Sequence, residues 1–183
     1  PNTTSTFSLC HDNKSLKNEL NRILELYKQL EFEQNLQNKV DRLEDLAKQQ
    51  KELSEQTKKK DSSTEDLKNK QEELNKDFKS LEQELKELAE KNQELEKPND
   101  FKNPEKETKE IEQNQKDSKE NLNKNDKQKA AQKQEKAAEQ MKQLAEQLQE
   151  NQQQGEEEEA KTNAAELRKI LENLLSTSFA QEK

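Results

Sequence analysis

Few residues in this chain of 183 carry the side chains that catalysis or tight metal binding requires. It has one cysteine and one histidine, and the two are adjacent, Cys10 and His11. A zinc site needs three or four His, Cys or carboxylate ligands, and a catalytic triad needs a histidine between a nucleophile and an acid. A single thiol also permits no internal disulfide, so the pattern favours a spare thiol over a nucleophile.

The remaining candidate chemistry is equally sparse. The single glycine, Gly155, excludes a glycine-rich loop for binding phosphate groups. The glutamates at 156–159 could attract Ca²⁺ only weakly, because a calcium cage needs about six or more spaced oxygen ligands. Other carboxylates alternate with lysines, as is typical of solvated helix faces. The sequence therefore predicts no enzyme, no catalytic residue, no cofactor and no metal site.

Composition limits the class of fold. Charged residues make up 40% of the chain, hydrophobic residues 25% and aromatic residues 3%, with a net charge of −8. So few apolar side chains cannot fill a layered interior, and they must be used in narrow seams between helices. The negative net charge argues against nucleic acid as a partner. No apolar run approaches the roughly 20 residues that cross a bilayer. Since the sequence shows no initiator methionine and no signal peptide, we expect a segment of a longer polypeptide.

The strongest pattern is a heptad seam that ends at Leu95. Leucines recur every seven residues from Leu67 to Leu95. Four residues after each of the first four leucines stand Gln71, Phe78, Leu85 and Asn92. A repeat of about 3.5 residues keeps one stripe of a helix facing a partner helix. Disorder is the rival that this composition suggests, but a disordered polar segment has no reason to space leucines in this way. The seam predicts a long helix packed on another helix.

From these signals we expect an all-α, elongated, coiled-coil-like bundle of about five helices. Residues 1–13 are predicted to be a flexible lead and residues 14–97 an antiparallel hairpin, with Ser63 or Ser62 capping its second helix. A linker at 98–103 begins with Pro98 and is followed by Pro104. Residues 104–152 form a second, alanine-rich hairpin with a tight turn at 121–126. An acidic linker at 153–159 leads to an amphipathic helix at 160–180.

The same periodicity predicts which residues pack between helices. If the first turn centres near Asp61, Leu43 faces Phe78 and Tyr27 faces Leu95. The predicted packing residues are Leu67, Leu74, Phe78, Leu81, Leu85, Leu88, Leu95, Leu20, Ile23, Tyr27, Leu30, Leu36, Val40 and Leu43.

The first helix is also predicted to extend beyond the second, and its apolar stripe is wider there. We expect that end to be covered by Phe101 together with the helix at 160–180, a second copy of the chain, or a segment outside this sequence. The candidate partner surface consists of Leu16, Leu24, Phe101, Leu167, Ile170, Leu171 and Leu174.

Several stretches resemble a large, uncharacterised membrane-anchored protein family of Bacteroidota, a domain of unknown function. The resemblance rests on ELNRILELYKQLEFEQ at 19–34, LEDLA at 43–47, KELSEQT at 51–57, NQELEKPN at 92–99, AAEQMKQL at 137–144, and LRKILENLL at 167–175 with Ser178 and Phe179. It covers residues 14–182 and leaves out the first dozen residues.

The resemblance implies a helical segment from the middle of a long cell-envelope protein, attached to the membrane through helices upstream of this segment. That family has no established activity, so no functional residues can be carried over. We therefore expect a structural or protein–protein interaction segment whose partners are proteins, other parts of a longer chain, or a second copy. The alternative is a regulatory or accessory subunit that scaffolds an envelope enzyme or a secretion complex.

Overall fold

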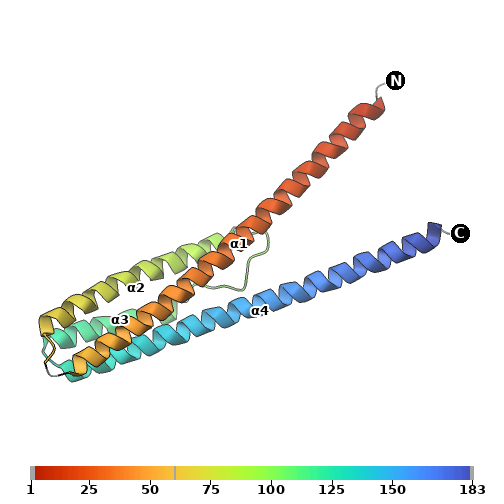
Figure 1. The fold of residues 1–183 in the computed structure, drawn as a ribbon. Helices are drawn as coiled ribbons and strands as arrows, with labels where there is room; N and C mark the ends of the chain where they lie inside the picture. The colour runs from red at the N-terminus through yellow and green to blue at the C-terminus, as the bar shows by residue number, and fades with distance from the viewer. Residues whose placement is uncertain (1–2, 60, 182–183) are drawn as a thin grey trace.

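The computed structural model describes residues 3–59 and 61–181, and over them the chain forms four helices and no strand. These are α1 (Thr3–Lys58), α2 (Thr64–Gln93), α3 (Glu105–Asn123) and α4 (Lys127–Gln181), shown in Figure 1. Side chains are described at Lys17, over 20–59 and 61–155, and at Glu157. The all-α class predicted from the sequence is confirmed.

The helix ends follow local sequence signals. Ser63 rather than Ser62 caps α2, because the Ser63 hydroxyl accepts a hydrogen bond from the backbone N–H of Asp66. The tight turn before α4 is made by Asn125, whose φ of 56° is the left-handed conformation that asparagine tolerates. The Asp126 carboxylate then accepts from the backbone N–H of Lys129 and satisfies a free donor of the first turn of α4.

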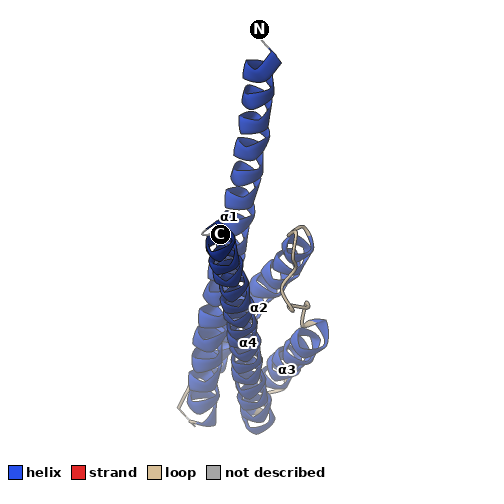
Figure 2. Ribbon diagram, turned by 90° about the vertical axis from the view of Figure 1, so that its right-hand side faces the viewer, coloured by secondary structure: helices blue, strands red, loops and turns tan. Residues whose placement is uncertain are grey.

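The four helices run alternately in opposite directions around one bundle. α1 contacts α2 and α4, and α3 also contacts α2 and α4, so each helix lies beside two neighbours. Figure 2 views the same arrangement from one end. α1 and α4, which share the most extensive contact, both continue past the ends of α2 and α3, and the chain termini lie at the same end of the molecule (Figure 1).

The core is built from the predicted seams. The six packing residues predicted on α2 are buried, and so are Leu95, just after its end, and Leu36, Val40 and Leu43 on α1. α4 contributes Met141, Leu144 and Leu148 together with Ala130, Ala131, Ala137, Ala138 and Ala145. Small alanine side chains allow α4 to approach the other helices closely, and one apolar cluster therefore spans all four helices.

The register between α1 and α2 agrees with a turn centred near Asp61. Glu84 on α2 accepts from Arg42 on α1 through both carboxylate oxygens, at 2.6 and 2.7 Å, and pairs with Lys39 at 2.9 Å. Partial burial, the largest single influence, raises the pKa of Glu84, but the two cations together hold it below its usual value.

The prediction of five helices was wrong, because no linker interrupts residues 153–159. α4 runs through Gly155 to Gln181 as one helix. A glycine inside a helix costs only about 1 kcal/mol relative to alanine, and the flanking glutamines and glutamates are good helix formers. Without a proline or a turn residue in the left-handed region, nothing there ends the helix.

The flexible lead also differs from the prediction, because α1 begins at Thr3. Residues 3–13 are rich in Ser, Thr and Asn, which suggested a loop, but they contain neither glycine nor proline. Extending an existing helix by one residue is much easier than nucleating one, so polar residues of modest propensity can continue α1 toward its N-terminus.

The two predicted hairpins pack against each other in one bundle. Residues 98–104 form an irregular corner after α2, which ends at Gln93 rather than near Lys97. This corner turns α3 back along α2 and places both hairpins around a common core. The sequence did not indicate how the hairpins pack on each other, because α3 carries only two large apolar residues in its buried face, Ile111 and Leu122.

Leu81 tests whether this core stabilises the whole bundle. Its side chain is fully buried, so Leu81→Ala should lower the free energy of unfolding by about 2–5 kcal/mol through lost burial and the cavity left behind. Denaturant unfolding followed by circular dichroism measures this change. The matched control is Lys79→Ala on the exposed face of α2, and an equal effect of the two substitutions would contradict the assigned core.

Candidate functional site

A layer of four glutamines crosses the core, with one residue from each helix. Gln50 of α1, Gln71 of α2, Gln115 of α3 and Gln134 of α4 are all buried, at 0 to 1% exposure. Apolar side chains of α1 and α2 enclose the layer on both sides along the bundle. Buried amides in such a position are destabilising unless they are hydrogen-bonded.

The amides bond mainly to one another. Gln50 and Gln71 exchange two hydrogen bonds of 3.0 Å, each amide donating to the oxygen of the other. Gln115 donates to Gln50 Oε1 at 3.1 Å, and Gln134 donates to Gln71 Oε1 at 3.0 Å. The Ser118 hydroxyl also donates to Gln71 Oε1. The reciprocal pair between α1 and α2 is thus the centre to which α3 and α4 attach.

This layer restricts how the helices can slide against one another. Moving any helix by one turn would separate its glutamine from the other three and leave its partners without hydrogen bonds, at about 1–3 kcal/mol for each unpaired group. The oxygens of Gln115 and Gln134 already accept no hydrogen bond, so the layer has little spare bonding capacity. A single polar residue in a helical seam can fix register in the same way.

A second polar cluster closes the corner at 98–104. The Asn92 side chain donates to the backbone oxygen of Asn99 at 2.8 Å and accepts from its backbone N–H at 2.8 Å. Gln29 of α1 donates to Asn99 Oδ1 at 2.6 Å. The ring of Phe101 meets Phe32 edge to face, with centroids 5.7 Å apart. These contacts attach the corner to α1 and fix where α1 leaves the bundle.

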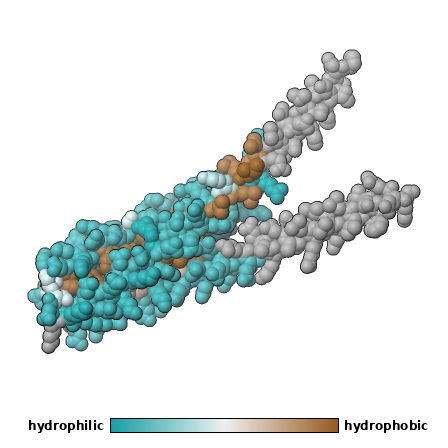
Figure 3. Space-filling view, in the orientation of Figure 1, coloured by the Kyte–Doolittle hydropathy of each residue, from teal (hydrophilic) through white to brown (hydrophobic). Residues whose placement is uncertain are grey.

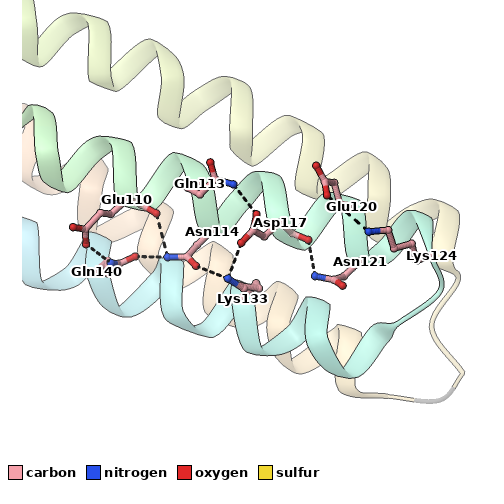
Figure 4. Close-up of polar contacts among 9 residues, drawn as sticks. All are labelled: Glu110, Gln113, Asn114, Asp117, Glu120, Asn121, Lys124, Lys133 and Gln140. Carbon is pink, nitrogen blue, oxygen red and sulfur yellow. Dashed lines mark hydrogen bonds and ion pairs between the residues drawn. The ribbon is translucent and has the colours of Figure 1, made fainter.

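Polar side chains also line the contact between α3 and α4, as Figure 4 shows. Lys133 of α4 bonds Asp117 of α3 at 2.6 Å, and Asn114 donates to Gln140 at 2.7 Å. The hydrogen bond from Lys133, followed by one from Gln113, holds the pKa of Asp117 below its usual value. Such partly exposed pairs specify alignment more than they stabilise the fold.

The most unusual surface feature is an apolar stripe on α1. It comprises six large side chains that are 51 to 64% exposed, Leu20, Ile23, Leu24, Leu26, Tyr27 and Leu30, and is called the α1 stripe below. Figure 3 shows it as the brown area where α1 leaves the bundle. Single exposed apolar residues are ordinary, but a contiguous patch of this kind marks an interaction surface on most soluble proteins.

The α1 stripe faces away from the bundle. Gln29 donates a hydrogen bond to Asn99 of the corner, and Glu25 accepts one from the backbone N–H of Glu96. These two residues therefore define the inward face of α1 at this level. At 3.6 residues per turn, the centre of the stripe lies about half a turn round the helix from that face. Neither α2 nor the corner can therefore cover it.

A shallow groove adjoins the α1 stripe. It has a volume of about 190 Å³ and lies between α1 and the end of α2, with Phe32, Leu88 and Leu95 among its lining residues. Lys28 and Glu31 border it on the α1 side. The groove extends the area that a partner helix lying along α1 could contact.

Several predicted site residues are placed differently from the expectation. Leu20, Ile23, Tyr27 and Leu30, predicted to pack between helices, are exposed, because the apolar positions shift round α1 between Leu30 and Phe32. Among the candidate partner residues, Leu24 is exposed, and Phe101 is buried against Phe32 in the molecule itself. The side chains of Leu16, Leu167, Ile170, Leu171 and Leu174 lie outside the described residues.

The glutamine layer as a whole was not predicted from the sequence, although Gln71 stands in the heptad seam. A signal was present, because Gln50 continues the spacing of Leu43 and Ala47. Likewise the buried residues of α3 step by three and four through polar side chains, at Thr108, Ile111, Gln115, Ser118 and Leu122. Polar residues at seam positions are thus the signal for both the glutamine layer and the buried face of α3.

Within the described residues, no helix combines the length and apolarity needed to cross a membrane. No group of three or more His, Cys, Asp or Glu side chains there is placed to hold a metal ion.

Comparisons of the chain with protein-family models, curated proteins and solved structures gave no match. The α1 stripe therefore remains the candidate functional site on its geometry alone.

The role of the glutamine layer can be tested by two variants. Gln71→Ala should lower the free energy of unfolding by about 2–4 kcal/mol, because it leaves buried amides unpaired and opens a cavity. Replacing all four glutamines by leucine should restore stability but relax the register, because apolar side chains of similar volume specify alignment less strictly.

Denaturant unfolding measures the first effect, and the number and sharpness of backbone amide NMR peaks measures the second. Gln83→Ala, on the exposed face of α2, is the control for the loss of a glutamine. An all-leucine variant that gives one sharp peak for each residue would show that the layer does not select the register.

Proposed function

We propose that this chain is a non-catalytic, rigid helical segment that presents the α1 stripe to a protein partner. The observation that carries this proposal is the position of the stripe, on the one face of α1 that the bundle leaves uncovered. The glutamine layer and the corner contacts hold α1 in a defined direction, so the stripe is presented without a large further loss of conformational entropy on binding.

A protein partner suits this surface better than a lipid surface. Between residues 17 and 34 the chain has three basic residues and four acidic ones. Helices that lie on membranes carry an excess of lysine and arginine opposite their apolar face, which this segment lacks. The mixed charges resemble the rim that surrounds an apolar interface core between proteins.

The cell-envelope setting of this proposal rests on the family resemblance. In that setting the membrane attachment is supplied by helices upstream of this segment, and the bundle is an interaction module of the longer protein. Leucine, isoleucine and tyrosine in one stripe would supply the buried centre of the contact.

The test compares two substitutions two residues apart in the full-length protein, purified from its own cells. Ile23→Asp places a charge in the α1 stripe, whereas Asn21→Asp adds the same charge at an exposed position on the other side of α1. We expect Ile23→Asp to reduce the recovery of a co-purifying protein by tenfold or more, since losing one buried aliphatic side chain costs about 1.5–3 kcal/mol.

Quantitative mass spectrometry of the purified assembly provides the measurement. Both variants should keep the helicity of the parent chain, because neither position is in the core. Identical sets and amounts of co-purifying proteins in the two variants and the parent would contradict the proposal that the stripe binds a partner.

A further inference from the structure

The spacing of the α1 stripe is symmetric about Glu25. Leu20 and Leu30 lie five residues to either side, Ile23 and Tyr27 two residues to either side, and Leu24 and Leu26 one residue to either side. A helix turned end for end about this centre presents large apolar side chains at the same positions. The stripe is therefore complementary in pattern to an antiparallel copy of itself.

Such a pattern suits contact around a two-fold axis, in which the same surface serves both copies. With two α1 helices antiparallel, Leu20 of one meets Leu30 of the other, and Ile23 meets Tyr27. Leu24 would lie near Leu24 of the second copy on one side of the seam, and Leu26 near Leu26 of the second copy on the other side. Every residue of the stripe then has an apolar neighbour, which an arbitrary partner helix would not guarantee.

The rest of the molecule permits this arrangement. The bundle lies on the opposite face of α1, as the contacts of Gln29 with Asn99 and of Glu25 with the backbone of Glu96 show. In an antiparallel pair the two bundles would extend toward opposite ends and away from the shared seam. The contact involves no residue of the core, so each bundle can keep its own packing.

Area and charge indicate how strong the contact can be. The six exposed side chains offer an apolar area on the order of 600 Å² in each copy, below the roughly 800 Å² of a standard interface. Lys17 faces Glu31 on one flank, whereas Glu19 faces Glu33 on the other, so the ionic contributions nearly cancel. Apolar contact must then carry the association, and a reversible dimer is expected.

We infer that a second copy of this chain covers the α1 stripe, in an antiparallel pair of α1 helices whose two-fold axis passes beside Glu25. This inference rests on the proposed function and names the partner as the chain itself. The expected dissociation constant is on the order of 10 μM, as befits an interface of less than standard size.

Sedimentation equilibrium of the 183-residue chain tests the association. The mass should rise from that of one chain, 21.5 kDa, toward twice that value between roughly 1 and 200 μM. Ile23→Asp should weaken dimerisation more than tenfold, whereas Asn21→Asp should change it less than threefold. A chain that stays monomeric over this range, or a dimer that Ile23→Asp leaves intact, would overturn the inference.

Cross-linking tests the direction of the helices. In a Cys10→Ser background, a Lys17→Cys chain and a Glu31→Cys chain should form a disulfide when mixed and oxidised, whereas either chain alone should form little. Efficient cross-linking of each chain with itself would indicate a parallel pair and would overturn the antiparallel arrangement.

The two proposals can fail separately. If the purified chain is monomeric but Ile23→Asp removes a co-purifying protein from the assembly in cells, self-association is overturned. The α1 stripe is then the site for a different protein. A chain that dimerises as expected, with a native assembly that Ile23→Asp does not change, would overturn the binding of a different protein and leave self-association standing.

Discussion

The reciprocal hydrogen bonds between Gln50 and Gln71 join α1 to α2 inside the core and set how the helices align. A chain with 25% hydrophobic residues has little apolar contact with which to distinguish one alignment of four helices from the next. The amide pair makes that distinction, because a shifted helix would leave buried amides unpaired. Gln115 and Gln134 extend the same constraint to α3 and α4.

A fixed register in the core determines what α1 exposes beyond it. α1 uses one face for the core as far as Phe32 and carries its large apolar side chains on the opposite face from Leu30 to Leu20. The corner at 98–104 lies between these two regions and holds α1 through Gln29 and the ring of Phe32. The bundle thus supports the α1 stripe without covering it, and packing inside the molecule is linked to contact outside it.

Sequence patterns predicted the parts of this fold that depend on leucine spacing. The heptads of α2 fixed its buried face, and the short turn before Ser63 fixed its pairing with α1. The buried face of α3 was not recognised, because Gln115 and Ser118 occupy positions where an apolar residue is expected. The face of the α1 stripe was misassigned for a different reason. Spacing shows that these residues share one face of α1, but the apolar positions shift round the helix between Leu30 and Phe32, and that face therefore points away from the core.

The most direct test of this account is the exchange of side-chain amide protons with solvent, followed by NMR. The amides of Gln50, Gln71, Gln115 and Gln134 should exchange orders of magnitude more slowly than those of Gln83 and Gln113, which are exposed. Cross-peaks should also connect the side-chain amides of Gln50 and Gln71. Exchange of the four layer glutamines at the rate of the exposed ones would show that the layer does not form and would contradict the account.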